Sequence, residues 1–70
     1  MGADMRVMLN GEPSEIKDNS TVADLLDSLG IGRERVAVEV NLDIVPKAQY
    51  DAHILSAGDK IEIVHFVGGG

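Results

Sequence analysis

The spacing of hydrophobic positions divides the chain into strand-like and helix-like stretches. Two strand-like stretches, Arg6–Leu9 and Glu12–Lys17, flank the dipeptide Asn10-Gly11. Asn-Gly readily supplies the positive φ angles of a type I′ turn, so this region is predicted to be a β-hairpin. Pro13 lacks a backbone N–H and places the second strand at an edge of the sheet. Residues 1–4 show no periodicity and are expected to be loose.

A helical period follows the hairpin. Four apolar residues are spaced at i, i+3, i+4 and i+7, which predicts a short amphipathic helix with one buried face. Thr21 and Asp24 fit a capping box at its start, and Gly30 fits a left-handed residue at its end. The four apolar positions are Val22, Leu25, Leu26 and Leu29.

The second half of the chain returns to strand character. Val36–Val40 alternates with a period of two and predicts a strand with one buried face. Next come a predicted turn at 41–43, a brief extended piece that Pro46 stops, and one helical turn within 47–52. A Gly58-Asp59 turn then leads into a final strand, Lys60–Val67.

On this final strand the two faces differ. Ile61 and Ile63 are expected to point to one side of the strand. Val64 and Phe66 form an apolar pair on the other side, and we expect another surface to cover this pair. The chain has one predicted helix for all of its predicted strands. This order of strands and helix predicts an α+β fold of the β-grasp type. In it a mixed sheet wraps around the helix, and the last strand lies centrally beside the first.

Composition limits the function. The 70 residues include 12 acidic and 6 basic residues, for a net charge of −6, which argues against nucleic acid or an anionic membrane surface as partner. The absence of cysteine rules out disulfides and a cysteine nucleophile, and gives no reason to expect secretion. A single small, soluble, cytoplasmic domain is expected, more plausibly a carrier or substrate than an enzyme.

No group within the chain is typical of catalysis or metal binding. His53 and His65 have no metal-ligand spacing to other residues, and the aspartates fall at predicted caps, turns and exposed helix positions. The sequence ends with Gly68-Gly69-Gly70, directly after the final strand. A glycine tail is either a frayed end or a slender segment that enters an enzyme cleft, and composition alone leaves both open.

By elimination, the carboxyl group of Gly70 is the candidate reactive group. Gly68 and Gly69 would form the thin segment that enters the partner's active site with it. A free carboxylate is a poor electrophile and must first be activated, most simply as an acyl adenylate made from ATP. Another protein must supply that activity. This chain would therefore have no catalytic residue and bind no metal or cofactor of its own.

Several segments resemble the ThiS family of sulfur carriers from thiamin biosynthesis, within the ubiquitin-like β-grasp superfamily, and the resemblance covers nearly the whole chain. The most specific is the closing string from Ile61 to Gly70, IEIVHFVGGG. The others are the Asn10-Gly11 hairpin, the helix start TVADLL at 21–26, VEVN at 38–41, IVP at 44–46 and the Gly58-Asp59 turn.

The resemblance implies that an E1-like, ThiF-type enzyme adenylylates Gly70 with ATP and magnesium. A sulfur donor enzyme then supplies sulfur to form a thiocarboxylate, which a ThiG-type thiazole synthase receives. Val64 and Phe66 are the candidate docking surface for the adenylating enzyme.

Three alternatives remain open from the sequence. The first is the small subunit of molybdopterin synthase, a related carrier that commonly has prolines before its tail, where this chain has His65-Phe66-Val67. The second is a ubiquitin-like modifier attached to lysines through Gly70. The third is a plain binding module that uses Val64 and Phe66 as an adhesive patch.

Overall fold

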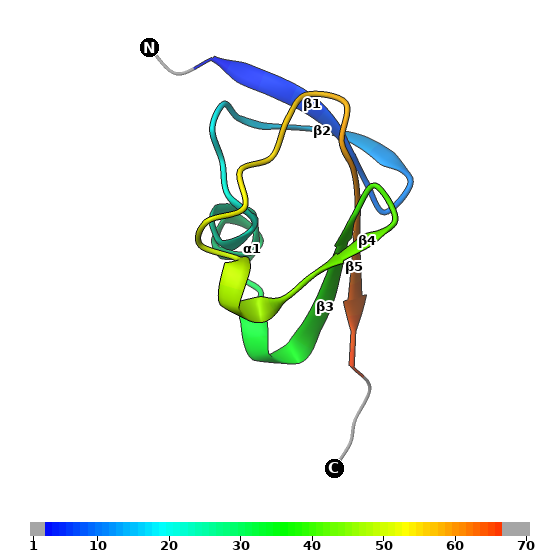
Figure 1. Cartoon of the computed structure of the whole chain (residues 1–70). Helices are drawn as coiled ribbons and strands as arrows, with labels where there is room; N and C mark the ends of the chain where they lie inside the picture. Colours follow the sequence, from blue (N-terminus) through cyan, green and yellow to red (C-terminus); the bar gives the residue numbers. More distant parts are fainter. Residues whose placement is uncertain (1–2, 67–70) are drawn as a thin grey trace.

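One five-stranded mixed sheet curves around a single α-helix in the computed structural model, which describes residues 3–66 (Figure 1). The strands are ordered β2-β1-β5-β3-β4 across the sheet. This confirms the predicted β-grasp arrangement. The elements are β1 (Asp4–Leu9), β2 (Glu12–Lys17), α1 (Val22–Leu29), the 3₁₀ turn η1 (Arg33–Arg35), β3 (Val36–Val40), β4 (Asp43–Val45), the 3₁₀ turn η2 (Lys47–Gln49) and β5 (Lys60–His65).

The β1–β2 hairpin forms as predicted. Asn10 and Gly11 have φ angles of 50° and 85°, as a type I′ turn requires, and β2 lies at the sheet edge. The expectation that residues 1–4 are loose is wrong for Asp4, which pairs with Lys17. Hydrogen bonding extends the hairpin further, because the Ala3 carbonyl accepts from the Asp18 N–H at 2.8 Å.

The helix begins with the predicted capping box. The Thr21 hydroxyl accepts from the Asp24 N–H, and the Asp24 carboxylate accepts from the Thr21 N–H, each at 3.0 Å. Gly30 ends the helix at φ 69°, in the left-handed conformation. This cap fixes where the chain enters the helix.

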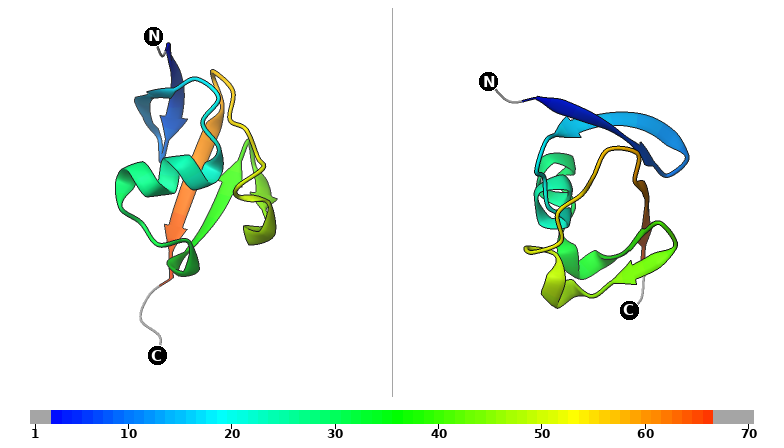
Figure 2. Two further views of the ribbon diagram at one scale, coloured as in Figure 1. Left: turned by 90° about the vertical axis from the view of Figure 1, so that its left-hand side faces the viewer. Right: turned by 45° about the horizontal axis from the view of Figure 1, so that its top comes forward.

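The apolar stripe of the helix is shorter than predicted. Val22, Leu25 and Leu26 are buried, but Leu29 is 44% exposed because the C-terminal end of α1 extends past the sheet (Figure 2). Ile31, just beyond the helix, packs against the core. With eight residues, α1 is also the longest helix of residues 3–66, too short to cross a membrane.

The β3–β4 hairpin turns through Asn41 and Leu42, whose φ angles are 54° and 74°. The predicted turn at 41–43 is therefore one residue shorter, since Asp43 is already in β4. The predicted helical turn within 47–52 is confirmed as η2, and it delivers Tyr50 to the core, where it is fully buried. Neither the burial of Tyr50 nor the η1 turn was predicted.

Strand β5 occupies the centre of the sheet beside β1, as predicted. It runs parallel to β1 and antiparallel to β3. Ile61 and Ile63 point into the core against the helix. The strand ends at His65, two residues before the predicted end, and Val67 lies outside the described residues. The central strand of the fold thus ends three positions before the glycines at 68–70 in the sequence.

Candidate functional site

The histidine and carboxylate side chains of the described residues do not form a metal-binding cluster. Within residues 3–66, no three histidine or carboxylate side chains come close enough together to hold a metal ion. His53 is partly exposed and His65 is exposed, and neither takes part in a side-chain hydrogen bond with another described residue. The two histidines therefore supply no assembled site.

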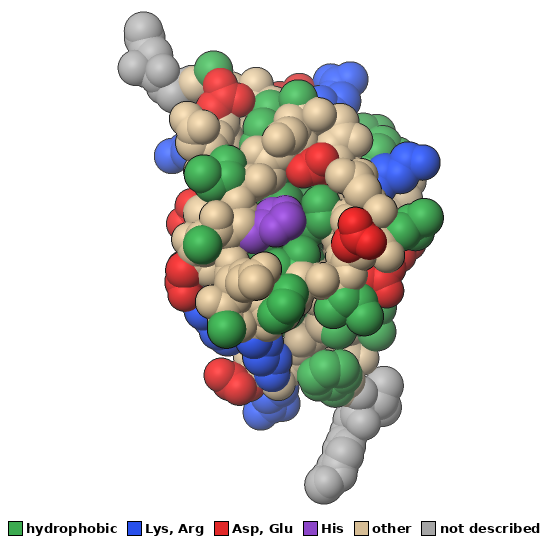
Figure 3. All heavy atoms as spheres, in the orientation of Figure 1, with side chains coloured by type: hydrophobic (Ala, Val, Ile, Leu, Met, Phe, Trp, Pro, Cys, Tyr) green, Lys and Arg blue, Asp and Glu red, His purple; other side chains and the backbone are tan. Residues whose placement is uncertain are grey.

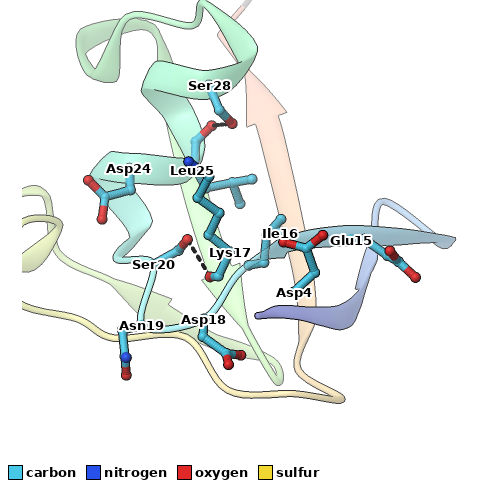
Figure 4. A pocket seen from close by; sticks show the side chains of 10 residues that line it. All are labelled: Asp4, Glu15, Ile16, Lys17, Asp18, Asn19, Ser20, Asp24, Leu25 and Ser28. Carbon is cyan, nitrogen blue, oxygen red and sulfur yellow. Dashed lines mark hydrogen bonds between the residues drawn. The ribbon is translucent and has the colours of Figure 1, made fainter. Parts of the chain in front are cut away.

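A groove of about 590 Å³ lies between β2 and α1, close to the start of β1 (Figure 4). Four carboxylates line it: Asp4, Glu15, Asp18 and Asp24. Two of its polar groups have structural roles, because Asp24 caps the helix and the Ser20 hydroxyl donates to the Lys17 carbonyl at 2.6 Å. The groove lies at the opposite end of the molecule from the C-terminal end of β5 (Figures 1 and 4).

The two docking residues predicted from the sequence lie together near the end of β5, on the outer face of the sheet. Val64 is 55% exposed and Phe66 is 58% exposed. Within residues 3–66 no element covers this face, since the helix packs against the opposite face. Two apolar side chains thus meet solvent directly before the glycine tail.

The sequence reasoning missed a third apolar residue of this face, Ile44, which is 70% exposed. Its neighbour Val45 is buried, so strand alternation turns Ile44 to the outer face, where it pairs with Glu39 across β3. The signal was available in the sequence, because a two-residue apolar strand must place one side chain outward. We call Ile44, Val64 and Phe66 the outer-face patch.

A cation lies at the border of the outer-face patch. The Lys47 ammonium nitrogen is 5.9 Å from the centre of the Phe66 ring, within range of a cation–π interaction. Figure 3 shows hydrophobic side chains gathered on this side of the molecule, near the C-terminal end of the described residues. The patch is therefore apolar with a charged border, as is typical of a protein-binding surface.

The end of β5 is held firmly by its neighbours. The Phe66 N–H donates to the Arg35 carbonyl at 2.9 Å, and His65 pairs with Val36 of β3. The η1 turn that carries Arg35 is itself tied to the η2 region, because Arg33 makes two hydrogen bonds to the Asp51 carboxylate at 2.9 and 3.0 Å. The point from which residue 67 continues is thus fixed relative to the patch.

Gly68, Gly69 and Gly70 lie outside the described residues. Their predicted role as a reactive tail stays a prediction. The structure adds the position of Phe66, the last described residue before them, which lies at the end of the central strand and in an exposed apolar surface.

Comparison with known proteins identifies the family. The ThiS family matches residues 7–70, from the fourth residue of the described β1 to the last glycine. The sulfur carrier protein ThiS of Bacillus subtilis is 45% identical over 65 residues, which are 91% of this chain and 98% of that protein. A crystal structure of a thiamine biosynthesis protein (ThiS) from Geobacter metallireducens superposes with a TM-score of 0.81 at 33% identity, covering 94% of this chain and all of that one.

A longer protein also matches. A thiazole synthase of Paramagnetospirillum magneticum is 47% identical over 66 residues, which are 94% of this chain but only 20% of that protein. The chain thus spans a fifth of the length of this relative, which carries a region similar to it beside other sequence. The family match over residues 7–70 and the full-length likeness to ThiS proteins agree, and the chain belongs to the ThiS family.

Proposed function

We propose that this protein is a sulfur carrier of thiamin biosynthesis, which holds sulfur as a thiocarboxylate on Gly70. The observation that supports this most is the match of the ThiS family through Gly70, combined with coverage of 98% of the Bacillus subtilis sulfur carrier. The fold is consistent with this role, because the central strand β5 ends three positions before the first of the three glycines in the sequence.

The proposed chemistry has two steps, both at the Gly70 carboxyl group. First, a carboxylate oxygen attacks the α-phosphorus of ATP, and pyrophosphate leaves with the electrons of the broken P–O bond. Then sulfur at the oxidation level of sulfide attacks the carbonyl carbon, a C–S bond forms, and AMP leaves with its oxygen. The thiocarboxylate that results is a nucleophile able to deliver sulfur to a receiving enzyme.

This chain would be the substrate in both steps, with the catalytic groups on an E1-like adenylating enzyme that uses ATP and magnesium. This chain has, within residues 3–66, no three histidine or carboxylate side chains that could hold a metal ion, so the magnesium is assigned to the enzyme. Since the chain also has no cysteine, no thiol of its own competes for the adenylate. A sulfur donor enzyme would supply the sulfur, in the cytoplasm.

Glycine suits the reacting end for a steric reason. The carboxyl group must reach a nucleotide inside another protein's active site, and a side chain would widen the segment that enters it. Fully extended, the four residues after Phe66 span at most about 14 Å. The surface that meets the partner must therefore include the end of β5 and its surroundings.

The proposed receiver of the sulfur is a thiazole synthase. Support comes from the Paramagnetospirillum magneticum protein of that name, which contains a region 47% identical to this chain. A carrier-like region and an enzyme are expected to occur in one chain when the carrier and the enzyme act on each other. The outer-face patch is the proposed docking surface for the adenylating enzyme, because it is apolar, exposed and close to the glycines in the sequence.

Adenylylation itself can be tested by ATP–pyrophosphate exchange with the E1-like enzyme. The full chain should stimulate the exchange, and a chain lacking Gly70 should not, while both have the same circular dichroism spectrum and melting temperature. Equal exchange with both chains would overturn the assignment of Gly70.

A further inference from the structure

Strand β5 is central in the sheet, but β1 flanks only its first residues. Strand β3 accompanies it from Ile61 to His65, whereas β1 pairs with it only at Lys60 and Ile61. The hairpin turn at Asn10-Gly11 then carries the chain away from β5. On the β1 side, the C-terminal half of β5 is therefore an open edge within the described part of the chain.

The hydrogen bonds show which groups face this edge. On the β1 side, the Ile61 carbonyl accepts from the Asn10 N–H at 2.8 Å, and the Ile63 N–H donates to the Asn10 side-chain oxygen, also at 2.8 Å. On the β3 side, the Phe66 N–H donates to the Arg35 carbonyl. Since backbone groups alternate along a strand, the odd-numbered residues face the β1 side.

Three backbone groups of the described residues follow the last bond to Asn10 on that side: the Ile63 carbonyl, the His65 N–H and the His65 carbonyl. None of residues 3–66 lies in a strand beside them, and His65 is exposed. An exposed donor and acceptor in extended geometry form a template for a further strand. The sheet edge at β2 contains Pro13 and charged residues that protect it, whereas the described part of this edge consists of Ile63 and His65.

We propose that the adenylating enzyme places an extended segment along this open edge, so that the sheet of the carrier continues into its partner at Ile63–His65. The inference rests on the proposed function. The adenylating enzyme is the expected occupant of the edge because of the short distance involved. The four residues after Phe66 span at most about 14 Å, so an active site that holds the Gly70 carboxyl lies within that distance of Phe66. The enzyme must therefore contact the end of β5.

The chemistry of the occupant follows from the outer face. An added strand would place alternate side chains beside Val64 and Phe66, so apolar residues at those positions would bury the exposed pair. The backbone bonds would fix the direction of the tail, and the apolar contacts would add affinity. Together they would hold the carrier in one register while the glycines reach the nucleotide.

A matched pair of substitutions isolates the backbone donor. His65→Pro removes the His65 N–H, while His65→Ala removes the same side chain and keeps it. Proline is tolerated where the missing N–H faces an open edge, and it favours extended backbone at the preceding Val64. Both variants should fold, and the proline variant should bind the adenylating enzyme at least about tenfold more weakly than the alanine variant. Equal dissociation constants for two folded variants would overturn the proposal.

Hydrogen exchange provides a second measurement that needs no substitution. The His65 amide should exchange fast in the free chain and become protected when the adenylating enzyme is added with ATP and magnesium. An unprotected amide in the complex would overturn the proposal, as would protection that rises with the concentration of the chain alone, which would assign the edge to a second copy. If the unaltered chain is adenylylated and the amide stays unprotected, only this inference fails. If no adenylylation occurs, the proposed function fails with it.

Discussion

The side-chain oxygen of Asn10 accepts a hydrogen bond from the Ile63 N–H at 2.8 Å, joining residues 53 positions apart in the chain. Asn10 thereby has two roles, since it also adopts the positive φ of the hairpin turn. Where β1 stops pairing with β5, this side chain replaces the next backbone acceptor. The contact holds the hairpin to the strand that leads to the glycines.

Replacing Asn10 by glycine should therefore destabilise the domain although the turn is preserved. Glycine adopts positive φ freely, but the partly buried Ile63 N–H loses its acceptor, at a cost of about 1–2 kcal/mol. Asn10→Asp keeps an oxygen at the same place and should lose less. Urea denaturation of both variants measures this, and an unchanged free energy of unfolding for Asn10→Gly would show that the bond contributes nothing.

The β3–β4 turn contains a strained residue that can be relieved. Leu42 has a φ of 74° and is 82% exposed, so its side chain contributes little burial at a backbone conformation that disfavours a Cβ. Leu42→Gly should raise the free energy of unfolding by about 1 kcal/mol, because Asn-Gly is the preferred type I′ pair.

The reverse change at the β1–β2 turn is the matched control. Gly11 has a φ of 85°, and a Cβ built there meets no atom within 4 Å. Gly11→Leu should thus lower stability by about 1–2 kcal/mol through backbone strain alone. If both variants shift stability in the same direction, the account of the two turns is wrong.

The ion pair between Arg33 and Asp51 predicts a pH dependence. Hydrogen bonding from Arg33, and then its charge, lower the pKa of Asp51 in the folded protein. A lowered folded pKa gives stability that is present above the unfolded pKa and is lost as pH falls through the folded value. In Arg33→Gln, NMR titration should show a higher pKa for the Asp51 carboxyl than in the parent chain.

The same substitution should lower the melting temperature more at pH 7 than at a pH below the folded pKa of Asp51, where this carboxyl is protonated in both folded and unfolded chains. The effect is expected to be small, because both groups are exposed to solvent. An identical Asp51 pKa in both proteins would contradict the ion pair.

The outer-face patch predicts a loss of partner binding without a loss of folding. Phe66→Ala and Ile44→Ala should each weaken binding to the adenylating enzyme by about tenfold or more, since exposed apolar side chains at a docking surface often dominate affinity. Ile54, as exposed as Phe66 at 58% but on the loop between η2 and β5, is the control. If Ile54→Ala weakens binding as much as Phe66→Ala, the patch has no special role.

Much of the fold was predictable because local chemistry dictates it. Asn10-Gly11 determined a turn type, Thr21 and Asp24 determined where the helix begins, and Gly30 determined where it ends. Each of these signals acts within a few residues, so tertiary contacts are not needed to read them.

Features that depend on distant contacts were missed or misplaced. Asp4 joins β1 only because the facing β2 extends to Lys17, and Leu29 is exposed only because α1 extends past the sheet. Tyr50 is buried because η2 returns the chain to the core. In the candidate site, Val64 and Phe66 were predicted from alternation along one strand, whereas Ile44 joins them across the sheet.

The most direct test of the central claim is the mass of the chain after incubation with the adenylating enzyme, ATP, magnesium and inorganic sulfide. The account predicts a mass increase equal to replacement of one oxygen by sulfur, with fragmentation placing the change on Gly70. Neither heat-denatured enzyme nor omission of ATP should produce the change. An unaltered mass after verified adenylylation, or sulfur located on any other residue, would contradict the claim that Gly70 carries sulfur as a thiocarboxylate.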